Sequence, residues 1–394
     1  MIIQDPFSLK HLPYGIVNLQ DDHPHLAVRY RDLAVSLEML RRHKLLTVGE
    51  EITRSRSLNP FLRLSPSQRS DIRARIKELL AGEEHLQAPG ATLDLKPYPQ
   101  DDSRVLCPVE ARDFVDFYCS RHHAFRVGCL FRGPENALPE RYFHLPIGYH
   151  GRSSTLFGSG RPIPRPQGIR KGEPPTFGDS QRLDYELEVG FVLHGHQGRL
   201  SPEEAWQKIF GVMLVNDWSA RDIQAFEYKP LGPFLGKSFA TTVGGWITPM
   251  EALKAWRCEN TDSDHDVLPH LAESEPHHLD LPLQADLTNS AGDTVTVCRS
   301  NLKNLAWSAA QMVAHLSSNG TIITAGDVIA TGTVSGPEKG AEGCLLERTE
   351  GGKAPFSVGQ EQRTFLLDGD TITLYGGHPG VGLAPCRGKV LASE

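Results

Sequence analysis

The spacing of apolar positions predicts a small number of helices. Residues 65–81 carry apolar side chains three and four positions apart, which places them on one helix face, and Gly82 follows as a stop signal. These side chains are Ile72, Ile76, Leu79 and Leu80. The run Ser-Pro-Glu-Glu at 201–204 has an N-cap, a first-turn proline and a capping-box glutamate, and predicts a helix towards Phe210. A further helix is predicted over Leu302–Leu316.

Elsewhere, short β-branched and aromatic runs alternate with glycine and proline, which predicts a β-rich protein. The chain contains 37 glycines and 28 prolines. The predicted strands are Leu183–Leu193, Gly211–Val215, Asp293–Cys298, Val328–Thr331, Thr364–Leu367 and Thr371–Tyr375. Asp368-Gly369, between the last two, predicts a hairpin. The fold class indicated is mainly β, or α+β.

Two segments lack a clear pattern of hydrophobic and polar positions. Residues 83–104 contain Pro89, Gly90, Pro97 and Pro99, so we expect a linker there, with a small N-terminal domain before it and a large C-terminal domain after it. Residues 258–281 are polar, acidic and rich in histidine, and we expect a surface excursion.

Composition narrows the class of protein. With 39% hydrophobic and 23% charged residues, the 394-residue chain is typical of globular proteins. Its net charge of −7 and the lack of a basic tract argue against nucleic-acid binding. No apolar run approaches the roughly 20 residues that span a bilayer, and the N-terminus lacks signal-peptide features. Seven cysteines, an odd number without a CxxC pair, argue against a disulfide framework and a zinc ribbon. We expect a soluble protein of a reducing compartment.

Three carboxylates stand out by their positions in the predicted strands. Glu186 and Glu188 are two residues apart, so in an extended strand they project from one face, about 6.6–7 Å apart. Asp217 follows the apolar run 211–215. Adjacent carboxylates repel unless solvent or a cation neutralises them, and oxygen-rich clusters suit Ca²⁺ or Mg²⁺. The pattern is compatible with either a solvated strand face or a cation site.

Several other motifs fail on their spacing. Gly232–Lys237 imitates a Walker A loop but has three residues between its glycines where the phosphate loop needs four. Residues 262–266 resemble the start of an EF-hand loop, but Val267 replaces the turn glycine and Pro269 interrupts the loop. There is no G-x-S-x-G nucleophile elbow. A water-based mechanism would need a histidine or carboxylate base, and His122-His123 offers two imidazoles that could equally be structural.

Several longer stretches together resemble the fumarylacetoacetate hydrolase family. They are Asp113–Tyr118, Leu145–Arg152, Asp184–Glu188 and Asn216–Lys237, with Leu12–Gly15 near the N-terminus and Phe365–Asp370 near the C-terminus. The resemblance therefore covers nearly the whole chain, including an N-terminal part that shorter members lack.

The resemblance implies a fold and an activity. The fold would be a small N-terminal SH3-like β-barrel (1–112) followed by a large C-terminal β-roll domain (113–394), assembled as a cytoplasmic homodimer. The activity would be hydrolysis of 4-fumarylacetoacetate to fumarate and acetoacetate, the last step of tyrosine and phenylalanine catabolism. The partner would be this small-molecule substrate, with neither nucleic acid nor membrane.

The resemblance also implies two metal ions. The family's Ca²⁺ ligands fall on Asp116, Glu186, Glu188 and Asp217. Its Mg²⁺ is associated with Asp217, Lys237 and Thr241, and Ala240 here replaces a glycine between the last two. A charged ammonium cannot ligate a metal, so we expect Lys237 to act through its backbone carbonyl or in a neighbouring role.

The remaining implied roles concern catalysis and substrate. The general base falls on His123, oriented by Glu347, and the oxyanion donors would be Arg221, Gln224 and Lys237. His122 stands where the family usually has glutamine; in an extended segment only one of the two rings could face the site. The substrate contacts fall on Tyr118, Arg132, Tyr149, Gln224, Tyr228 and Thr333. Among these, Arg132 suits a carboxylate.

Two alternatives remain open at this stage. The first is a related β-diketone or oxo-acid C–C hydrolase or decarboxylase on the same scaffold. The second is a non-catalytic Ca²⁺-binding module, which would keep the four carboxylates but would have no use for His123, Glu347 or Lys237.

Overall fold

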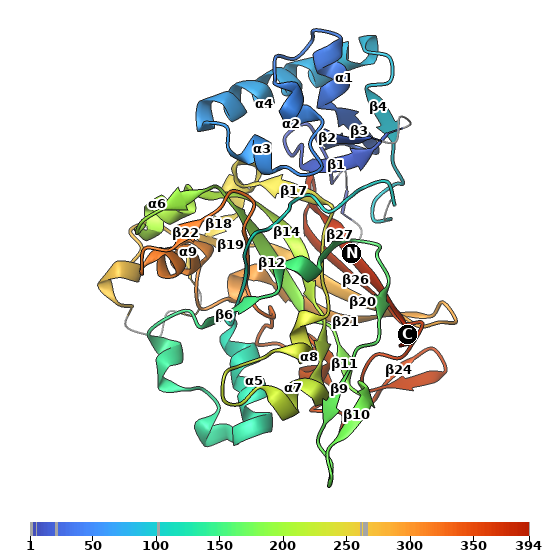
Figure 1. The fold of residues 1–394 in the computed structure, drawn as a ribbon, viewed down its shortest axis with the longest axis vertical. Coiled ribbons are helices and arrows are strands. Elements are labelled where there is room, and N and C mark those ends of the chain that lie inside the picture. Colours follow the sequence, from blue (N-terminus) through green and yellow to red (C-terminus); the bar gives the residue numbers. More distant parts are fainter. Residues whose placement is uncertain are drawn as a thin grey trace.

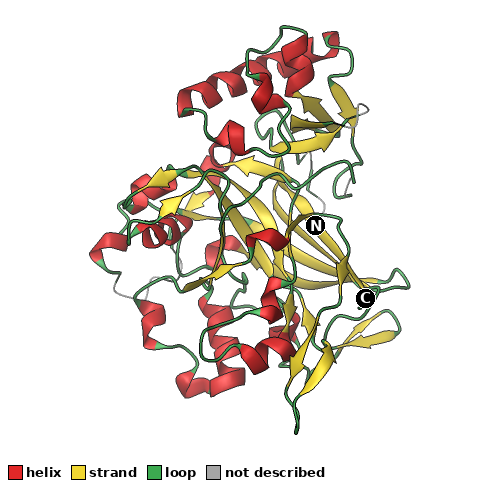
Figure 2. Cartoon of the chain, in the orientation of Figure 1, coloured by secondary structure: helices red, strands yellow, loops and turns green. Residues whose placement is uncertain are grey.

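The computed structural model describes residues 3–4, 6–19, 23–100, 103–260, 262 and 267–393. It has a mixed α and β fold with a sheet-rich C-terminal part, which agrees with the expected class (Figure 2). The α-helices are α1 (Leu37–Arg42), α2 (Glu50–Thr53), α3 (Asn59–Leu62), α4 (Pro66–Ala81), α5 (Arg121–Arg132), α6 (Pro202–Trp206), α7 (Arg221–Glu227), α8 (Leu235–Ser238), α9 (Ala309–Ser317) and α10 (Leu345–Arg348).

A large mixed sheet runs from the N-terminal part into the C-terminal part (Figure 1). Its strands are, in spatial order, β4 (Thr92–Asp94), β3 (Leu33–Ser36), β2 (Pro24–Tyr30), β1 (Tyr14–Asn18), β17 (Trp246–Pro249), β14 (Ile209–Asp217), β12 (Leu187–Leu193), β23 (Val328–Ala330), β5 (Phe114–Phe117) and β6 (Gly148–Gly151). β16 (Thr241–Val243) also pairs with β14, and with β7 (Leu156–Gly158). The antiparallel pairing of β1 with β17 joins the two parts of the chain.

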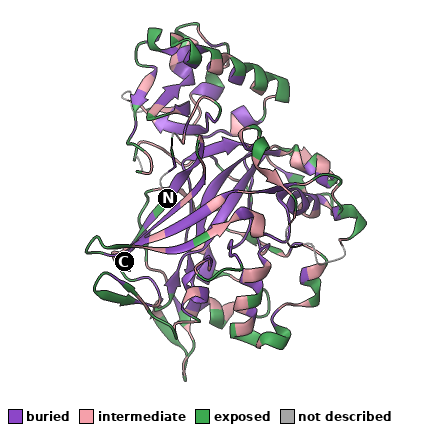
Figure 3. Cartoon of the chain, turned by 180° about the vertical axis from the view of Figure 1, so that it is seen from behind, coloured by how far each residue is buried: buried purple, intermediate pink, exposed green. Residues whose placement is uncertain are grey.

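A second sheet packs against the first through contacts of β26 and β27 with β14. Its order is β21 (Thr294–Asn301), β20 (Pro282–Thr288), β26 (Thr371–His378), β27 (Val381–Leu391) and β8 (Ile163–Pro164). The buried side chains concentrate on these central strands, whereas exposed positions gather on the outer helices, the peripheral hairpins and the loops (Figure 3). Trp218, Trp307 and Tyr185 are among the largest side chains of this core.

Smaller two-stranded ladders complete the fold. They are β9 (Gln167–Arg170) with β10 (Thr176–Asp179), β11 (Leu183–Asp184) with β15 (Ser219–Ala220), β13 (His196–Gln197) with β22 (Ile322–Ile323), β18 (Arg257–Cys258) with β19 (His278–Leu279), and β24 (Phe356–Val358) with β25 (Glu361–Arg363). The ladder of β11 with β15 matters most for the site, because it places Asp184 opposite Ser219, two residues before α7 begins.

The predicted helices are confirmed where capping signals define their ends. Ser65 and Ser201 each form a capping box at the start of α4 and α6. α6 ends at Trp206 rather than near Phe210, because β14 begins at Ile209. The start of the helix predicted over 302–316 is wrong, because Ser308 forms a capping box with Gln311 and α9 begins at Ala309.

The predicted strands are confirmed except at two places. The run 183–193 is divided into β11 and β12, with Tyr185 and Glu186 between them. The strand predicted over Thr364–Leu367 and its hairpin are wrong. Leu366 makes an isolated bridge to Leu183, while β26 pairs with β20 and β27. The turn at Asp368-Gly369 closes instead on Asp370, whose carboxylate accepts the Leu367 N–H at 2.9 Å.

Residues 83–104 and 258–281, in which the sequence shows no clear hydrophobic pattern, contain more regular secondary structure than expected. Residues 83–104 contain β4, which pairs with β3, so the expectation of a simple linker is wrong. Within 258–281, β18 pairs with β19, and Leu271, His277 and His278 are buried. The segment is therefore not merely a surface excursion, although residues 263–266 of the EF-hand-like motif lie outside the described residues. None of the helices described in the structure combines the length and apolarity that a membrane span requires.

Candidate metal and acid–base site

Adjacent strands bring four carboxylates together at one end of the large sheet. Asp116 lies on β5, Glu188 on β12 and Asp217 at the end of β14, while Glu186 immediately precedes β12. One oxygen of each lies within 4.8 Å of the others, and all four side chains are buried. The strand pairings explain the convergence, since β12 lies between β14 and β23, and β23 pairs with β5. The pair Glu186 and Glu188 therefore faces a cluster, not solvent.

Part of this cluster lacks compensating partners. Asp116 Oδ1 and both carboxylate oxygens of Glu188 are buried and accept no hydrogen bond from any residue that the structure describes. Burial and the neighbouring carboxylates raise the pKa of both groups well above their ordinary values. Four buried carboxylates, three of whose oxygens have no partner among the described residues, fit a hard divalent cation, which takes oxygen ligands. The residues thus fit the metal that the resemblance implies.

Two cations compensate the other part of the cluster. The Lys237 ammonium donates to Asp217 Oδ2 at 2.6 Å and to Glu186 Oε2, and Arg221 Nη2 lies 2.8 Å from Glu186 Oε1. Burial alone would raise the pKa of Glu186, but the charges of Lys237 and Arg221 outweigh it and lower this pKa. Burial opposes the charge on Lys237, yet Asp217 and Glu186 raise its pKa. The Lys237 side chain is therefore a charged donor and not a metal ligand.

Thr241 lies on the same side of the cluster. β16 places it directly opposite Asp217, and its hydroxyl donates to Asp217 Oδ1 at 2.8 Å. Ala240, the departure from the family pattern, is buried beside it. Thr241 thus contacts one of the predicted ligands.

A histidine and a glutamate form a second buried group. His123 lies on α5 and Glu347 on α10, and His123 Nδ1 is 2.6 Å from Glu347 Oε2. The same oxygen accepts hydrogen bonds from Ser335 Oγ at 2.8 Å and Cys344 Sγ at 3.2 Å. Burial would raise the pKa of Glu347, but the charge of His123 and these hydrogen bonds outweigh it and lower the pKa. An ionised Glu347 accepts the Nδ1 proton, so Nε2 of His123 is left as the basic atom.

The neighbouring histidine has a different environment. The extended geometry considered for His122 and His123 does not apply, because residues 121–132 form α5, with the Ser120 side chain capping its start. Consecutive helical residues point about 100° apart. As a result His123 is buried and His122 is half-buried.

The predicted substrate residues fall into two groups, of which the inner one adjoins the cluster. Tyr149 donates to Asp217 Oδ2 at 3.3 Å, and Gln224 Oε1 accepts from Arg221 Nη1 at 3.3 Å. The Tyr118 ring meets the His123 ring edge-on at 5.3 Å. The buried Thr333 hydroxyl has no hydrogen-bond partner among the described residues.

The outer group lies at the exposed end of α5. Arg132 is exposed, and its guanidinium donates to the carbonyls of Asn136 at 3.0 Å and Ala137 at 2.6 Å. The Tyr228 ring lies 6.3 Å from the exposed ring of Phe131. The structure thus places the Arg132 donors against backbone carbonyls of the segment that follows α5, and not against a free site.

A cavity reaches the carboxylate cluster from the surface. It has a volume of about 270 Å³, with Tyr149, Asp217, Lys237 and Thr241 among its lining residues and the exposed His150 at its rim. A larger cavity of about 640 Å³ lies between α2 and α4 and is lined by none of the predicted site residues. Cavity volume alone would therefore not have identified the candidate site.

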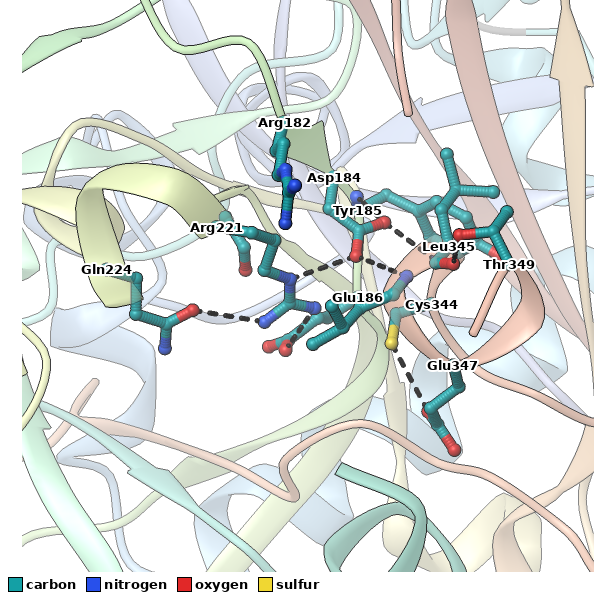
Figure 4. A network of polar contacts seen from close by, with 12 residues as sticks. Arg182, Asp184, Tyr185, Glu186, Arg221, Gln224, Cys344, Leu345, Glu347 and Thr349 are labelled. Atoms are coloured by element: carbon teal, nitrogen blue, oxygen red, sulfur yellow. Dashed lines mark hydrogen bonds and ion pairs between the residues drawn. The ribbon is translucent and has the colours of Figure 1, made fainter. Parts of the chain in front are cut away.

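Sequence reasoning missed several residues that support the site. Ser335 and Cys344 hold Glu347. Asp184 binds both Arg221 and the start of α10 (Figure 4). A weak signal existed for Asp184 alone, since it precedes Glu186 and Glu188 at the same spacing of two. Ser335 and Cys344 precede Glu347 by 12 and 3 positions, but neither belongs to a motif that would have indicated its role.

Comparisons with known proteins agree with this site. The Fumarylacetoacetate (FAA) hydrolase C-terminal model matches residues 113–391, and the Fumarylacetoacetase N-terminal model matches residues 10–108. Fumarylacetoacetase of Caenorhabditis elegans is 40% identical, with 98% of this chain and 97% of that protein aligned. Fumarylacetoacetase of Homo sapiens is 38% identical, with 98% and 96% aligned.

Solved structures support the same fold. A fumarylacetoacetate hydrolase from psychrophilic Exiguobacterium antarcticum superposes with a TM-score of 0.58 at 18% identity, covering 97% of this chain and 99% of that one. At this identity the likeness concerns the fold, whereas the family models and the relatives at 38–40% identity concern the sequence itself. The chain belongs to the fumarylacetoacetate hydrolase family.

Proposed function

We propose that this chain hydrolyses 4-fumarylacetoacetate to fumarate and acetoacetate, the last step of tyrosine and phenylalanine catabolism. The observation that carries this proposal is the similarity to fumarylacetoacetases along almost the entire length of the chain. The site supports it independently, because a buried His–Glu pair lies beside buried carboxylates that suit a cation.

The reaction needs an activated water. His123 Nε2 takes a proton from water, and the hydroxide adds to the carbonyl carbon that ends the fumaryl group. The C–C bond to the neighbouring methylene then breaks, so fumarate keeps the new oxygen and the acetoacetate enolate takes up a proton. Glu347 holds the imidazole through Nδ1 and stabilises its protonated form.

The oxyanion formed by this addition needs donors. Two of the three N–H groups of the Lys237 ammonium face Glu186 and Asp217, which leaves the third for the substrate. The Gln224 amide nitrogen is available because its oxygen faces Arg221, and Arg221 has N–H groups beyond those that its protein partners use. Each such donor is typically worth about 2.7–4 kcal/mol.

A divalent cation completes the proposed site. Asp116, Glu186, Glu188 and Asp217 would hold Ca²⁺, while Asp217, Thr241 and the backbone carbonyl of Lys237 would hold Mg²⁺. When bound, such a cation supplies Lewis-acid polarisation of the diketone oxygens and favours the enolate leaving group.

The substrate side of the proposal rests on the two groups of residues described above. Tyr118, Tyr149 and Thr333 would bind the diketone region near the cluster. Arg132 and Tyr228 would bind a terminal carboxylate at the end of α5, which requires Arg132 to turn from the Asn136 and Ala137 carbonyls.

Fold detail and assembly are part of the proposal as well. We propose domains 1–112 and 113–394, since the family-model matches end at 108 and begin at 113. The N-terminal domain would be an SH3-like barrel and the C-terminal domain a β-roll. A cytoplasmic homodimer is proposed, and the seven free cysteines support a reducing compartment.

A direct assay tests the proposed function. Purified protein with Ca²⁺ or Mg²⁺ is added to fumarylacetoacetate, and loss of the diketone absorbance is followed while products are separated by chromatography. We expect equal amounts of fumarate and acetoacetate. Cleavage of acylpyruvates but not fumarylacetoacetate would favour a related diketone hydrolase, and cation binding without turnover would favour the binding module.

A further inference from the structure

Asp184 is a buried carboxylate to which the catalytic scheme above gives no role. It is the last residue of β11, directly before Tyr185 and Glu186, which separate β11 from β12. Its Oδ1 accepts the backbone N–H groups of Tyr185 and Leu345, both at 2.8 Å. Its Oδ2 accepts the N–H of Leu346 and the Nε–H of Arg221, both at 2.9 Å (Figure 4). Four donors thus converge on a single side chain that is fully buried.

One side of this network leads to the acid–base pair. Leu345 and Leu346 are the first two residues of α10, and Glu347 is the third. α10 has four residues, and its N-cap residue Cys344 makes no side-chain capping bond to the helix. The Asp184 carboxylate therefore fixes the turn from which Glu347 reaches His123.

The other side leads to the carboxylate cluster. Arg221 begins α7, and its three nitrogens face three different side chains: Nε faces Asp184, Nη1 faces Gln224 and Nη2 faces Glu186. A guanidinium is a planar and rigid fork, so fixing Nε also fixes the direction of the other two nitrogens. Asp184 thus sets how Arg221 meets Glu186 and Gln224.

We propose that Asp184 is a positioning residue. It holds the turn that carries Glu347 and the Arg221 guanidinium in a fixed orientation to each other, and it thereby sets how the His123–Glu347 pair lies relative to the carboxylate cluster. The inference rests on the proposed hydrolase function for its kinetic consequences, but its structural consequences do not depend on turnover. Asp184 contacts neither His123 nor the Glu347 carboxylate; its contacts are to backbone N–H groups and to Arg221, a proposed oxyanion donor through which it would act.

The substitution Asp184→Asn tests this proposal. The amide keeps the shape but places its NH₂ group against donors, because every partner of Asp184 is an N–H group. We expect a loss of about 10–100-fold in Ca²⁺ affinity and in kcat, the range typical of groups that orient metal ligands. KM should change little, and the acid side of the pH–rate profile should move, because Glu347 no longer holds His123 correctly.

Glu38→Gln is the matched control. Glu38 is a buried carboxylate of the N-terminal part that bonds Arg41 at 2.8 Å, Arg42 at 2.7 Å and Thr53 at 2.6 Å. Its loss should lower the melting temperature but leave Ca²⁺ affinity and the pH–rate profile unchanged. Folded Asp184→Asn protein with wild-type Ca²⁺ affinity and pH profile would overturn the proposal.

A measurement on the wild-type protein covers the case in which Asp184→Asn does not fold. Coupling between sites is reciprocal, so Ca²⁺ alone should slow amide exchange at Leu345 and Leu346 more than at Gln311, whose buried N–H is capped by Ser308. Equal slowing at all three amides would contradict the proposal. If the wild type did not hydrolyse fumarylacetoacetate, the proposed function would fail, while Ca²⁺ affinity and exchange would still test the role of Asp184.

Discussion

His123 Nδ1 and Glu347 Oε2 lie 2.6 Å apart in the buried interior, although 224 positions separate the two residues in the sequence. The contact fixes which imidazole nitrogen carries the proton, because the ionised carboxylate can only accept. It therefore leaves Nε2 as the basic nitrogen, which in the proposed mechanism takes a proton from water.

The two adjacent histidines should differ sharply on substitution. His123→Ala should lower kcat by about 10²–10⁴-fold, because the water loses its proton acceptor. His122→Gln should keep most of the activity, since this ring is half-buried on another side of α5. Steady-state kinetics on both variants checks the assignment. An inactive His122→Gln together with an active His123→Ala would show that the base is assigned to the wrong residue.

Glu347→Gln should have an intermediate effect. The amide oxygen can still accept the Nδ1 proton, but its neutral charge no longer stabilises the imidazolium. We expect kcat to fall by roughly 10-fold, within the range of orienting partners. The acid side of the pH–rate profile should move to lower pH, because a protonated His123 is less favoured beside a neutral group. An unchanged profile would mean that Glu347 does not act through His123.

Glu188→Gln should stabilise the metal-free protein while abolishing strong cation binding. Burial and the charges of Asp116 and Asp217 raise the pKa of Glu188 above the ordinary value of 4.5. A carboxyl with a raised folded-state pKa binds its proton more tightly in the folded protein, so metal-free stability falls as pH rises above 4.5.

Melting curves in chelator and in Ca²⁺, between pH 5 and pH 8, provide the measurement for this variant. Metal-free Glu188→Gln should melt above metal-free wild type, and the gap should widen with pH. Ca²⁺ should raise the melting temperature of the wild type much more than that of the variant. If the variant melts lower than wild type in chelator, Glu188 is compensated by a partner and the cation site is wrongly described.

Lys237→Met should separate the two roles considered for this residue. The substitution keeps the backbone carbonyl but removes an ammonium that lies against Glu186 and Asp217. Turnover should fall by about 10²–10³-fold with the lost oxyanion donor. Cation affinity should rise, because a positive charge no longer competes for the carboxylates. Calorimetric titration with Ca²⁺ measures it, and a large fall in affinity would contradict the assignment of the side chain as a donor.

Helix ends could be predicted where the signal is local. The capping boxes of α4 and α6 satisfy backbone N–H groups through residues three positions apart, so the sequence contains the whole interaction. The hairpin at Asp368-Gly369 could not be judged in this way. Its outcome depends on Leu366 meeting Leu183 and on β26 pairing with β20 and β27, which are contacts between distant segments.

The candidate site was also predictable only where its signal is local in the sequence. The spacing of Glu186 and Glu188 indicates a shared face, but only the pairing of β12 with β14 and β23 brings Asp217 and Asp116 to them. The charges of the cluster also depend on Lys237, which the sequence places in a motif resembling a phosphate loop. The spacing of Asp184 before Glu186 and Glu188 hints that it belongs to the site, but its positioning role could not be predicted, because its partners Leu345, Leu346 and Arg221 come from other segments.

Hydrolysis in water enriched with oxygen-18 tests the central claim most directly. The purified protein with Ca²⁺ is given fumarylacetoacetate, and both products are analysed by mass spectrometry. Addition of water at the fumaryl carbonyl predicts one labelled oxygen in fumarate for each acetoacetate formed, at a rate that His123→Ala lowers by about 10²–10⁴-fold. Release of carbon dioxide in place of fumarate, or fumarate formation at an unchanged rate in His123→Ala, would contradict the account.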